Sequence, residues 1–284
     1  VFPPCQAKSK AKHVILIGLD GWGSYSVPKA DIPNIKQLMA NGSYTLEKRS
    51  ALPSSSAINW ASMFMGAGPE LHGYTEWGSK TPELPSRILN KHGIFPTIFQ
   101  LLREARPKAE IGCLYEWNGI KYLVDTLALN HYAQAPNYKE YPEALCNMAE
   151  TYIKEKQPTL LAVCFDNPDH IGHQKGHDTP EYYAKLKELD MYIGRIIHAV
   201  EEAGILKETI FIITADHGGI NKGHGGKTMQ EMQTPFIISG KNVKKGMEFH
   251  ESMMQYDVAS TIAYIFGLQQ PQVWIGRPMT QVFK

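Results

Sequence analysis

Residues 13–19 read HVILIGL and lead directly into Asp20 and Gly21. This short apolar run is rich in β-branched residues, which predicts a strand that is buried on both faces of a sheet. Strands of that kind form parallel sheets, in which crossover helices cover both faces. Open α/β sheets bind their ligands beyond the carboxyl ends of such strands, so Asp20 is the first candidate site residue.

Similar buried strands are predicted at residues 111–115, 159–165, 209–215 and 235–239, and a more polar extended stretch covers residues 43–52. Apolar residues at helical spacing predict helices at residues 58–65, 96–106, 143–156, 181–203 and 256–266. This alternation predicts an α/β fold, a three-layer sandwich with a largely parallel central sheet. Residues 74–93 and 118–141 are less regular, and we expect them to form loops that overhang the site and shape substrate choice.

Composition limits the class of protein. The chain has 284 residues, of which 43% are hydrophobic and 20% charged, and its formal net charge is +1. The length suits one large α/β domain, and the balanced charge argues against the basic surface that binds nucleic acids. No apolar run reaches the length of about 18 residues that a membrane-spanning helix needs. We therefore expect a small-molecule substrate, no nucleic-acid polymer and no membrane span.

Residues 1–12 are polar over much of their length and begin with Val1 rather than Met, so we interpret them as a disordered or processed tail. Residues 13–284 are expected to form a single catalytic domain, and a processed start favours a periplasmic or secreted protein. The four cysteines, Cys5, Cys113, Cys146 and Cys164, lack the spacing of a structural zinc site. A disulfide between Cys113 and Cys146 is left open.

Three predicted strands end in side chains that can bind metals. The candidate ligands are three carboxylates and three imidazoles: Asp20, Asp169, His173, Asp216, His217 and His224. This set is too large for one tetrahedral ion and suits two divalent cations. An acid and an imidazole directly after a buried strand, as at residues 216–217, would be destabilising without partners.

Alternatives remain for several of these positions. A single Asp after a strand, such as Asp20, is commonly a turn or capping residue. Residues 169 and 173 face the same side if they are helical, but His170 and His177 compete with His173 for the same metal, and Gly172 weakens the helix. His72 is equally compatible with a loop and with the wall of a site.

Ser56 is the candidate nucleophile because it lies at a corner between an extended stretch and a helix. Free backbone N–H groups and the positive end of the helix dipole can hold a phosphate oxyanion there. The alternative is a helix cap, which Ser54, Ser55 or Ser56 could form. A serine hydroxyl needs a base or a metal for activation, and the sequence contains no G-x-S-x-G elbow, which favours a metal.

Six ordered motifs carry a family resemblance: residues 18–21, 53–66 with Ser56 and Asn59, 69–73, 167–173, 214–218 and 223–225. Together they resemble the alkaline phosphatase superfamily, and most closely its nucleotide pyrophosphatase/phosphodiesterase branch. Residues 256–263 and 276–278 also resemble the C-terminal stretch of that branch. The resemblance implies an alkaline phosphatase-like fold and a metal-dependent phosphoester hydrolase.

The resemblance also implies roles for individual residues. One set of ligands would hold the metal that binds and deprotonates Ser56: Asp20, Asp216 and His217. The other set would hold a second metal: Asp169, His173 and His224. Asn59 would donate a hydrogen bond to a nonbridging phosphate oxygen, the intermediate would be a phosphoserine, and the two metals would be zinc.

The sequence departs from this branch in ways that bear on substrate preference. Ser56 stands where the branch usually has Thr, and Ala57 and Ile58 replace Phe-Pro. No Arg lies beside Ser56 to hold a dianionic phosphate, which favours diesters, and the Cys/Ser-x-Pro-x-Arg motif of sulfatases is missing.

The alternatives to a phosphodiesterase are a phosphomonoesterase or phosphonate hydrolase of the same superfamily and, less favoured, a noncatalytic metal-binding protein. One group of aromatic residues is also left open between stacking on a base and filling the core: Trp22, Trp60, Trp77 and Trp117.

Overall fold

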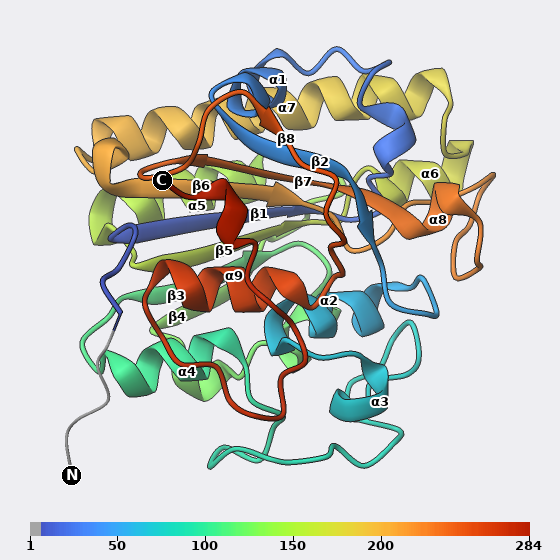
Figure 1. Cartoon of the computed structure of the whole chain (residues 1–284). Helices are drawn as coiled ribbons and strands as arrows, with labels where there is room; N and C mark the ends of the chain where they lie inside the picture. Colours follow the sequence, from blue (N-terminus) through green and yellow to red (C-terminus); the bar gives the residue numbers. More distant parts are fainter. Residues whose placement is uncertain (1–6) are drawn as a thin grey trace, which may run out of the picture.

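Strand β1 (His13–Leu19) lies inside an eight-stranded sheet, between β5 (Leu160–Phe165) and β6 (Thr209–Thr214). The computed structural model describes residues 7–284, and Figure 1 shows this sheet between two layers of helices. From Val14 to Leu19 every side chain of β1 is buried, as expected for a strand covered on both faces. The predicted three-layer α/β architecture is therefore confirmed.

The sheet has the order β4-β3-β5-β1-β6-β7-β2-β8. Its other strands are β2 (Gly42–Arg49), β3 (Ile111–Tyr115), β4 (His131–Gln134), β7 (Gln233–Gly240) and β8 (Met247–Glu248). Every pairing from β4 to β6 is parallel, whereas β7 runs antiparallel to both β6 and β2. The sheet is largely parallel, and β7 is reversed because it follows β6 without a crossover helix.

Two groups of helices cover the two faces of the sheet (Figure 1). On one face, α1 (Pro33–Ala40), α5 (Ala144–Lys156) and α7 (Pro180–Glu202) share a hydrophobic core with Ile15 and Ile17 of β1. On the other, α2 (Ser56–Met65), α4 (Ile98–Ala105) and α9 (Asp257–Ile265) share a core with Val14 and Leu16. Alternating side chains of one strand thus supply both cores. Three shorter helices are α3 (Pro69–His72), α6 (Asp169–Lys175) and α8 (Met229–Met232).

The sequence did not predict α1 or β4. Helix α1 buries only Ile35 and Leu38, so its apolar signal is short. Strand β4 reads HYAQ, is mostly exposed at the edge of the sheet, and lies within the predicted loop 118–141. That part of the loop prediction is wrong, whereas residues 74–93 contain no helix or strand, as expected.

The described part of the predicted tail is ordered. Lys10 N donates to Ile265 O at 2.7 Å and Lys12 N donates to Glu208 O at 3.0 Å. Ala11 between them is buried in the core that contains α9. Residues 7–12 are therefore part of the ordered structure, while residues 1–6, with Cys5, lie outside the described chain, and a processed start stays a prediction. The periplasmic or secreted location stays a prediction.

The structure contains no disulfide between Cys113 and Cys146. Cys113 and Cys146 are buried free thiols that belong to the cores on opposite faces of the sheet. Cys164 is likewise a buried free thiol. Across residues 7–284, no helix combines the length and the apolar character needed to cross a bilayer.

Candidate active site

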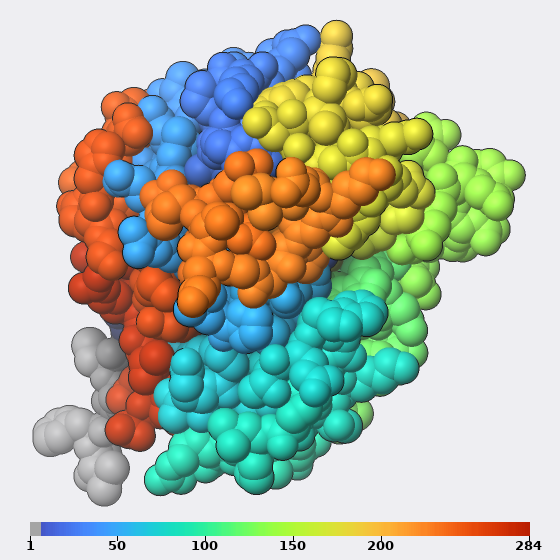
Figure 2. Space-filling view, turned by 90° about the vertical axis from the view of Figure 1, so that its right-hand side faces the viewer, coloured from blue at the N-terminus to red at the C-terminus, as the bar shows by residue number. Residues whose placement is uncertain are grey.

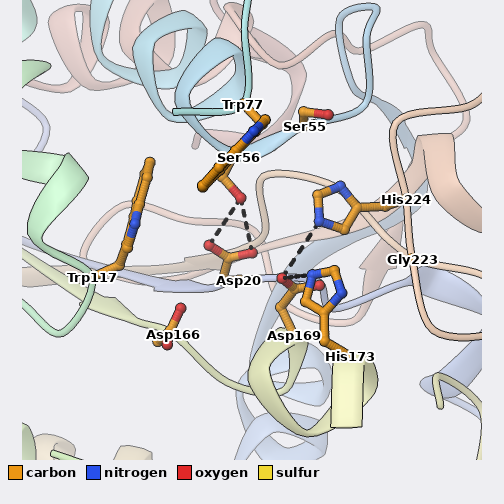
Figure 3. Close-up of a pocket in the computed structure, with 10 residues that line it drawn as sticks. All are labelled: Asp20, Ser55, Ser56, Trp77, Trp117, Asp166, Asp169, His173, Gly223 and His224. Carbon is orange, nitrogen blue, oxygen red and sulfur yellow. Dashed lines mark hydrogen bonds and ion pairs between the residues drawn. The ribbon is translucent and has the colours of Figure 1, made fainter. Parts of the chain in front are cut away.

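The carboxyl ends of β1, β5 and β6 meet at a cavity of about 490 Å³. Asp20 directly follows β1, Asp169 opens α6 shortly after β5, and residues 216–217 follow β6. Figure 3 shows how Asp20 and Asp169 converge with Ser56 and His224. The residues that line the cavity are Asp20, Ser55, Ser56, Trp77, Trp117, Asp166, Asp169, His173, Gly223 and His224.

The turn after β1 holds the buried carboxylates close together. Gly21 has a φ of +73°, and a Cβ there would lie 2.6 Å from the Cβ of Asp169, so only glycine fits. Its backbone N–H donates to Asp216 Oδ1 at 3.0 Å. Asp169 N donates to Asp20 O at 2.8 Å, so the ends of the two strands are joined by their backbones as well.

Trp60 fixes the orientation of Asp20, a role that the sequence did not reveal. The indole N–H of this buried residue donates to Asp20 Oδ2 at 3.2 Å. Its ring packs on Gly18 of β1, where a Cβ would lie only 2.3 Å from Trp60 Cη2. The motif glycine at position 18 is therefore needed so that Trp60 can reach the carboxylate across the strand.

Ser56 opens α2 and directs its hydroxyl at the ligand cluster. Its Oγ lies 3.1 Å from His217 Nε2, 3.4 Å from Asp20 Oδ2 and 3.5 Å from Asp20 Oδ1. The N-cap residue is Ser55, and no side chain caps this helix. Ser54 is bonded elsewhere, to the backbone of Gly225 and Gly226. The alternative of a capping role for Ser56 is therefore not what the structure shows.

The first candidate metal group surrounds this hydroxyl. His217 Nε2 lies 3.3 Å from Asp20 Oδ1 and 3.2 Å from Asp216 Oδ2. Asp216 Oδ1 accepts hydrogen bonds from two backbone N–H groups, but its Oδ2 is buried and accepts none in the described chain, despite that short distance to His217. Burial and the Asp20 carboxylate raise the pKa of Asp216 well above its usual range. This buried, unpaired oxygen is suited to a cation.

The second candidate group is centred on Asp169. Its Oδ2 lies 3.0 Å from His173 Nε2 and 3.5 Å from His224 Nε2. Burial opposes ionisation of Asp169, but hydrogen bonds from His173, His177 and His224 hold its pKa well below its usual range. Potential ligand atoms of residues 169, 173 and 224 all lie within 4.8 Å of one another, as do those of residues 20, 169 and 217.

The three imidazoles share one orientation that suits metal binding. In each, Nδ1 faces a backbone carbonyl: that of Lys222 for His173 at 2.8 Å, Gly218 for His217 at 2.6 Å and Ser54 for His224 at 2.9 Å. A neutral ring that donates its Nδ1 proton to a carbonyl leaves the lone pair of Nε2 for a cation. All three Nε2 atoms point at the carboxylates.

The competing histidines differ in the atoms that they contact. His177 is buried, with Nε2 3.1 Å from Asp169 Oδ1 and Nδ1 2.9 Å from Asn221 O, so it binds the carboxylate oxygen that His173 does not. Its ring packs against Gly172, where a Cβ would lie 2.4 Å away, which explains a glycine inside α6. His170 instead contacts Gln174 and does not line the cavity.

The Asn59 side chain binds the backbone of the segment that precedes Ser56. Its Nδ2 donates to the carbonyls of Ala51, Pro53 and Ser55, each at 3.1 Å, and its Oδ1 accepts from Ala51 N at 2.7 Å. The side chain is fully buried and does not line the cavity. In this arrangement Asn59 shapes the segment before the nucleophile, and a contact with phosphate would require it to leave these partners.

A buried lysine contacts the backbone directly before Asp216. Lys48 of β2 is fully buried, and its Nζ donates to Ala215 O at 3.0 Å and to the Gln255 side chain. Burial lowers the pKa of Lys48 to about 7, although the nearby carboxylates Asp216 and Asp257 favour its charged form. No sequence motif identified Lys48, because a lysine in a polar strand ordinarily faces solvent.

Comparison with known proteins identifies the relatives of this chain. The model of the type I phosphodiesterase/nucleotide pyrophosphatase family matches residues 14–100 and 105–230. Ectonucleotide pyrophosphatase/phosphodiesterase family member 1 of Mus musculus is 22% identical over 231 residues, 76% of this chain and 25% of the relative. The GPI ethanolamine phosphate transferase 2 of Aspergillus oryzae is 26% identical over 117 residues, 36% of this chain and 14% of the relative. The matches thus span a quarter or less of these relatives.

Solved structures with the same fold include two kinds of protein. An inactive variant of murine ectonucleotide pyrophosphatase/phosphodiesterase 5 in complex with AMP superposes with a TM-score of 0.74 and 14% identity, over 92% of this chain and 96% of that one. A 2-O GAG sulfatase superposes with a TM-score of 0.75 and 16% identity, over 95% of this chain and 73% of that one. At these identities the likeness concerns the fold, which is alkaline phosphatase-like.

His72 gives a prediction about stability, because the structure resolves it as a buried core residue. Its Nε2 lies 3.0 Å from Ser62 Oγ, its Nδ1 accepts from Tyr74 N at 3.0 Å, and burial lowers its pKa to about 3. In the unfolded chain the His72 imidazole binds a proton below a pH of about 6.5, whereas in the folded chain it stays neutral there. The free energy of unfolding therefore falls as the pH drops. Between pH 7 and pH 5 the wild type should lose about 2 kcal/mol more free energy of unfolding than His72→Gln. Urea unfolding at both pH values measures this, and equal losses would contradict it.

Proposed function

Because the chain belongs to the type I phosphodiesterase/nucleotide pyrophosphatase family, we propose that it is a metal-dependent phosphodiesterase with Ser56 as its nucleophile. The position of the Ser56 hydroxyl is the main support for this function. The Ser56 hydroxyl at the start of α2 faces the carboxylate and imidazole of the first ligand group, with Oγ 3.1 Å from His217 Nε2. A serine needs activation to attack phosphorus, and a cation held by these side chains would provide it.

Two divalent cations, with zinc as the expected metal, fit the donor set. Asp20, Asp216 and His217 would hold one of them beside Ser56. Asp169, His173 and His224 would hold the other. The close grouping of residues 20, 169 and 217 makes the Asp20 and Asp169 carboxylates neighbours of both positions. When bound, such cations act as Lewis acids that favour the serine alkoxide and neutralise charge on the departing oxygen.

The proposed reaction consists of two displacements at phosphorus, in which residues of the chain provide the nucleophile and stabilise negative charge. Ser56 Oγ forms a bond to phosphorus as the ester bond to the leaving alcohol breaks, and the serine proton is balanced by the proton that the departing alcohol takes up. Water then forms a bond to phosphorus, the Oγ–phosphorus bond breaks, and Ser56 regains a proton. The backbone N–H of Ser56 and the positive end of α2 would stabilise a nonbridging oxygen in both steps.

The charge of the cavity supports a diester substrate. Among the described residues that line it, none is Lys or Arg. A dianionic monoester would therefore find no cationic side chain to pair with its extra charge, whereas a diester carries a single charge. Phosphomonoester and phosphonate hydrolysis are the alternatives within the same chemistry, and nucleotide pyrophosphate hydrolysis is the activity named for the relatives.

Removal of the nucleophile tests the covalent route. Ser56→Ala should lower the turnover of bis(p-nitrophenyl) phosphate by at least about a thousandfold, because it removes the atom that bonds to phosphorus. Bound metal, measured by mass spectrometry, should stay near two ions. Ser62→Ala is the matched control, since Ser62 lies on the same helix and its hydroxyl contacts Ile58 O and His72 instead of the cavity. Substantial turnover by Ser56→Ala would contradict the route.

Substrate and metal dependence can be measured on the same preparation. EDTA should abolish activity and zinc should restore it, because no side chain of the cavity replaces the Lewis acid.

The value of kcat/KM for bis(p-nitrophenyl) phosphate should exceed that for p-nitrophenyl phosphate by at least about tenfold. A preference for the monoester would refute the proposed diester specificity, and two bound metals without any ester hydrolysis would indicate a noncatalytic protein.

Trp60 should influence metal affinity through Asp20. Trp60→Phe keeps an aromatic ring but removes the donor to Asp20 Oδ2, and partners of ligands typically change affinity by about 10–100-fold. Zinc affinity should fall within that range. Trp274→Phe removes a comparable buried indole bond, to Pro96 O at 3.0 Å, away from the ligands and is the control. Equal zinc affinities in the two variants would show that the bond to Asp20 has no such role.

A further inference from the structure

The buried side chain of Lys48 reaches from β2 to the residue that follows β6. Its exposed fraction is 0%, and its Nζ donates to Ala215 O at 3.0 Å, directly before Asp216. Figure 2 shows the segment after β6, in orange, as part of one outer face of the molecule, whereas Lys48 contributes to no face. Water therefore does not screen this ammonium group, and its charge acts through the protein interior.

A glutamine amide fixes the position of the ammonium group. Gln255 is fully buried, and its Oε1 accepts a hydrogen bond from Lys48 Nζ. Its Nε2 donates to Asn59 O and to Ala215 O, each at 3.1 Å. Only this orientation of the amide gives an acceptor to the ammonium group and donors to both carbonyls. The hydrogen-bond partners of Lys48 are thus neutral groups in fixed positions.

No carboxylate neutralises Lys48 by direct contact. Within residues 7–284, no carboxylate oxygen lies within 4 Å of its Nζ. The charged groups that act on it from farther away are the carboxylates of Asp216 and Asp257. Asp257 already accepts hydrogen bonds from the backbone N–H groups of Met254 and Arg277. Asp216 Oδ2 has no hydrogen-bond partner in the described chain, so the first ligand group is where the charge of Lys48 matters most.

The positive charge of Lys48 has opposite consequences with and without a metal. In the metal-free protein it offsets part of the repulsion among the buried carboxylates. When a divalent cation binds to the same carboxylates, the ammonium group and the cation repel each other. Burial lowers the pKa of Lys48 to about 7, so at pH 6 most of the metal-free molecules carry this charge. The lysine therefore stabilises the metal-free ligand group and opposes cation binding.

We propose that Lys48 is a built-in counter-charge of the first ligand group, which keeps the ligands assembled in the metal-free protein and weakens their affinity for the metal. This inference rests on the proposed function, because it concerns the cation beside Ser56. Lys48 acts through the ligands and is a positioning residue. A lysine with a merely structural role would stabilise the protein equally with and without metal.

Zinc affinity tests the sign of this effect. Lys48→Met replaces the ammonium group by a neutral side chain of similar length, and Lys48→Gln also keeps a hydrogen-bond donor. At pH 6.0, calorimetry should show that both variants bind zinc at least about threefold more tightly than the wild type, because the repulsion is removed. Gln255→Met is the matched control, since it disturbs the same hydrogen bonds without removing the charge, and it should not bind zinc more tightly. Equal or weaker zinc binding by both Lys48 variants, or an equal gain in Gln255→Met, would overturn the proposal.

Urea unfolding at the same pH separates a counter-charge from a structural lysine. Lys48→Met should lose more free energy of unfolding in EDTA than in saturating zinc, because tighter zinc binding compensates part of the loss. Equal losses under both conditions, in a wild type that binds zinc and hydrolyses bis(p-nitrophenyl) phosphate, would overturn the counter-charge alone. A wild type that binds no zinc would overturn the proposed function as well.

Discussion

The repulsion among three buried carboxylates is the constraint on which the rest of the site depends. Asp20, Asp169 and Asp216 are brought together because β5, β1 and β6 are adjacent and parallel, so their carboxyl ends share one edge. Burial makes each negative charge harder to keep. Backbone N–H groups, Trp60 and the buried Lys48 offset part of the free-energy cost of burying these charges. Within the described chain Asp216 Oδ2 has no hydrogen-bond partner, so this oxygen can bind a cation.

The nucleophile reaches this edge from the other half of the sheet. Strand β2 is separated from β6 by the antiparallel β7, and the chain after β2 must return toward β1. Ser50 Oγ donates to Asp216 O at 2.7 Å, and Asn59 binds three carbonyls of the segment before α2. These bonds set where α2 begins, and therefore where the Ser56 hydroxyl lies relative to the carboxylates.

Much of this arrangement could be predicted from the sequence, and the failures have physical causes. The limits of β1 and β3 were predicted correctly because both are apolar runs bounded by polar residues. Helix α1 and strand β4 were missed because they bury few apolar residues, and the reversed direction of β7 depends on a connection that periodicity does not encode. Trp60 supports Asp20 through a contact between distant segments, which no local pattern reveals. His177 was a candidate ligand, and its supporting role depends on its bond to the distant Asn221 carbonyl as well as on Asp169. The backbone partners of Asn59 lie only four to eight residues before it, but they belong to an irregular segment whose path periodicity does not describe.

In the proposed active site, one cluster of carboxylates and imidazoles holds two cations beside Ser56. Anomalous scattering at the zinc edge, from crystals grown with zinc, tests it most directly. Two peaks are expected, one among Asp20, Asp216 and His217 within reach of Ser56 Oγ, and one among Asp169, His173 and His224. A single peak, or peaks bounded by other side chains, would contradict it.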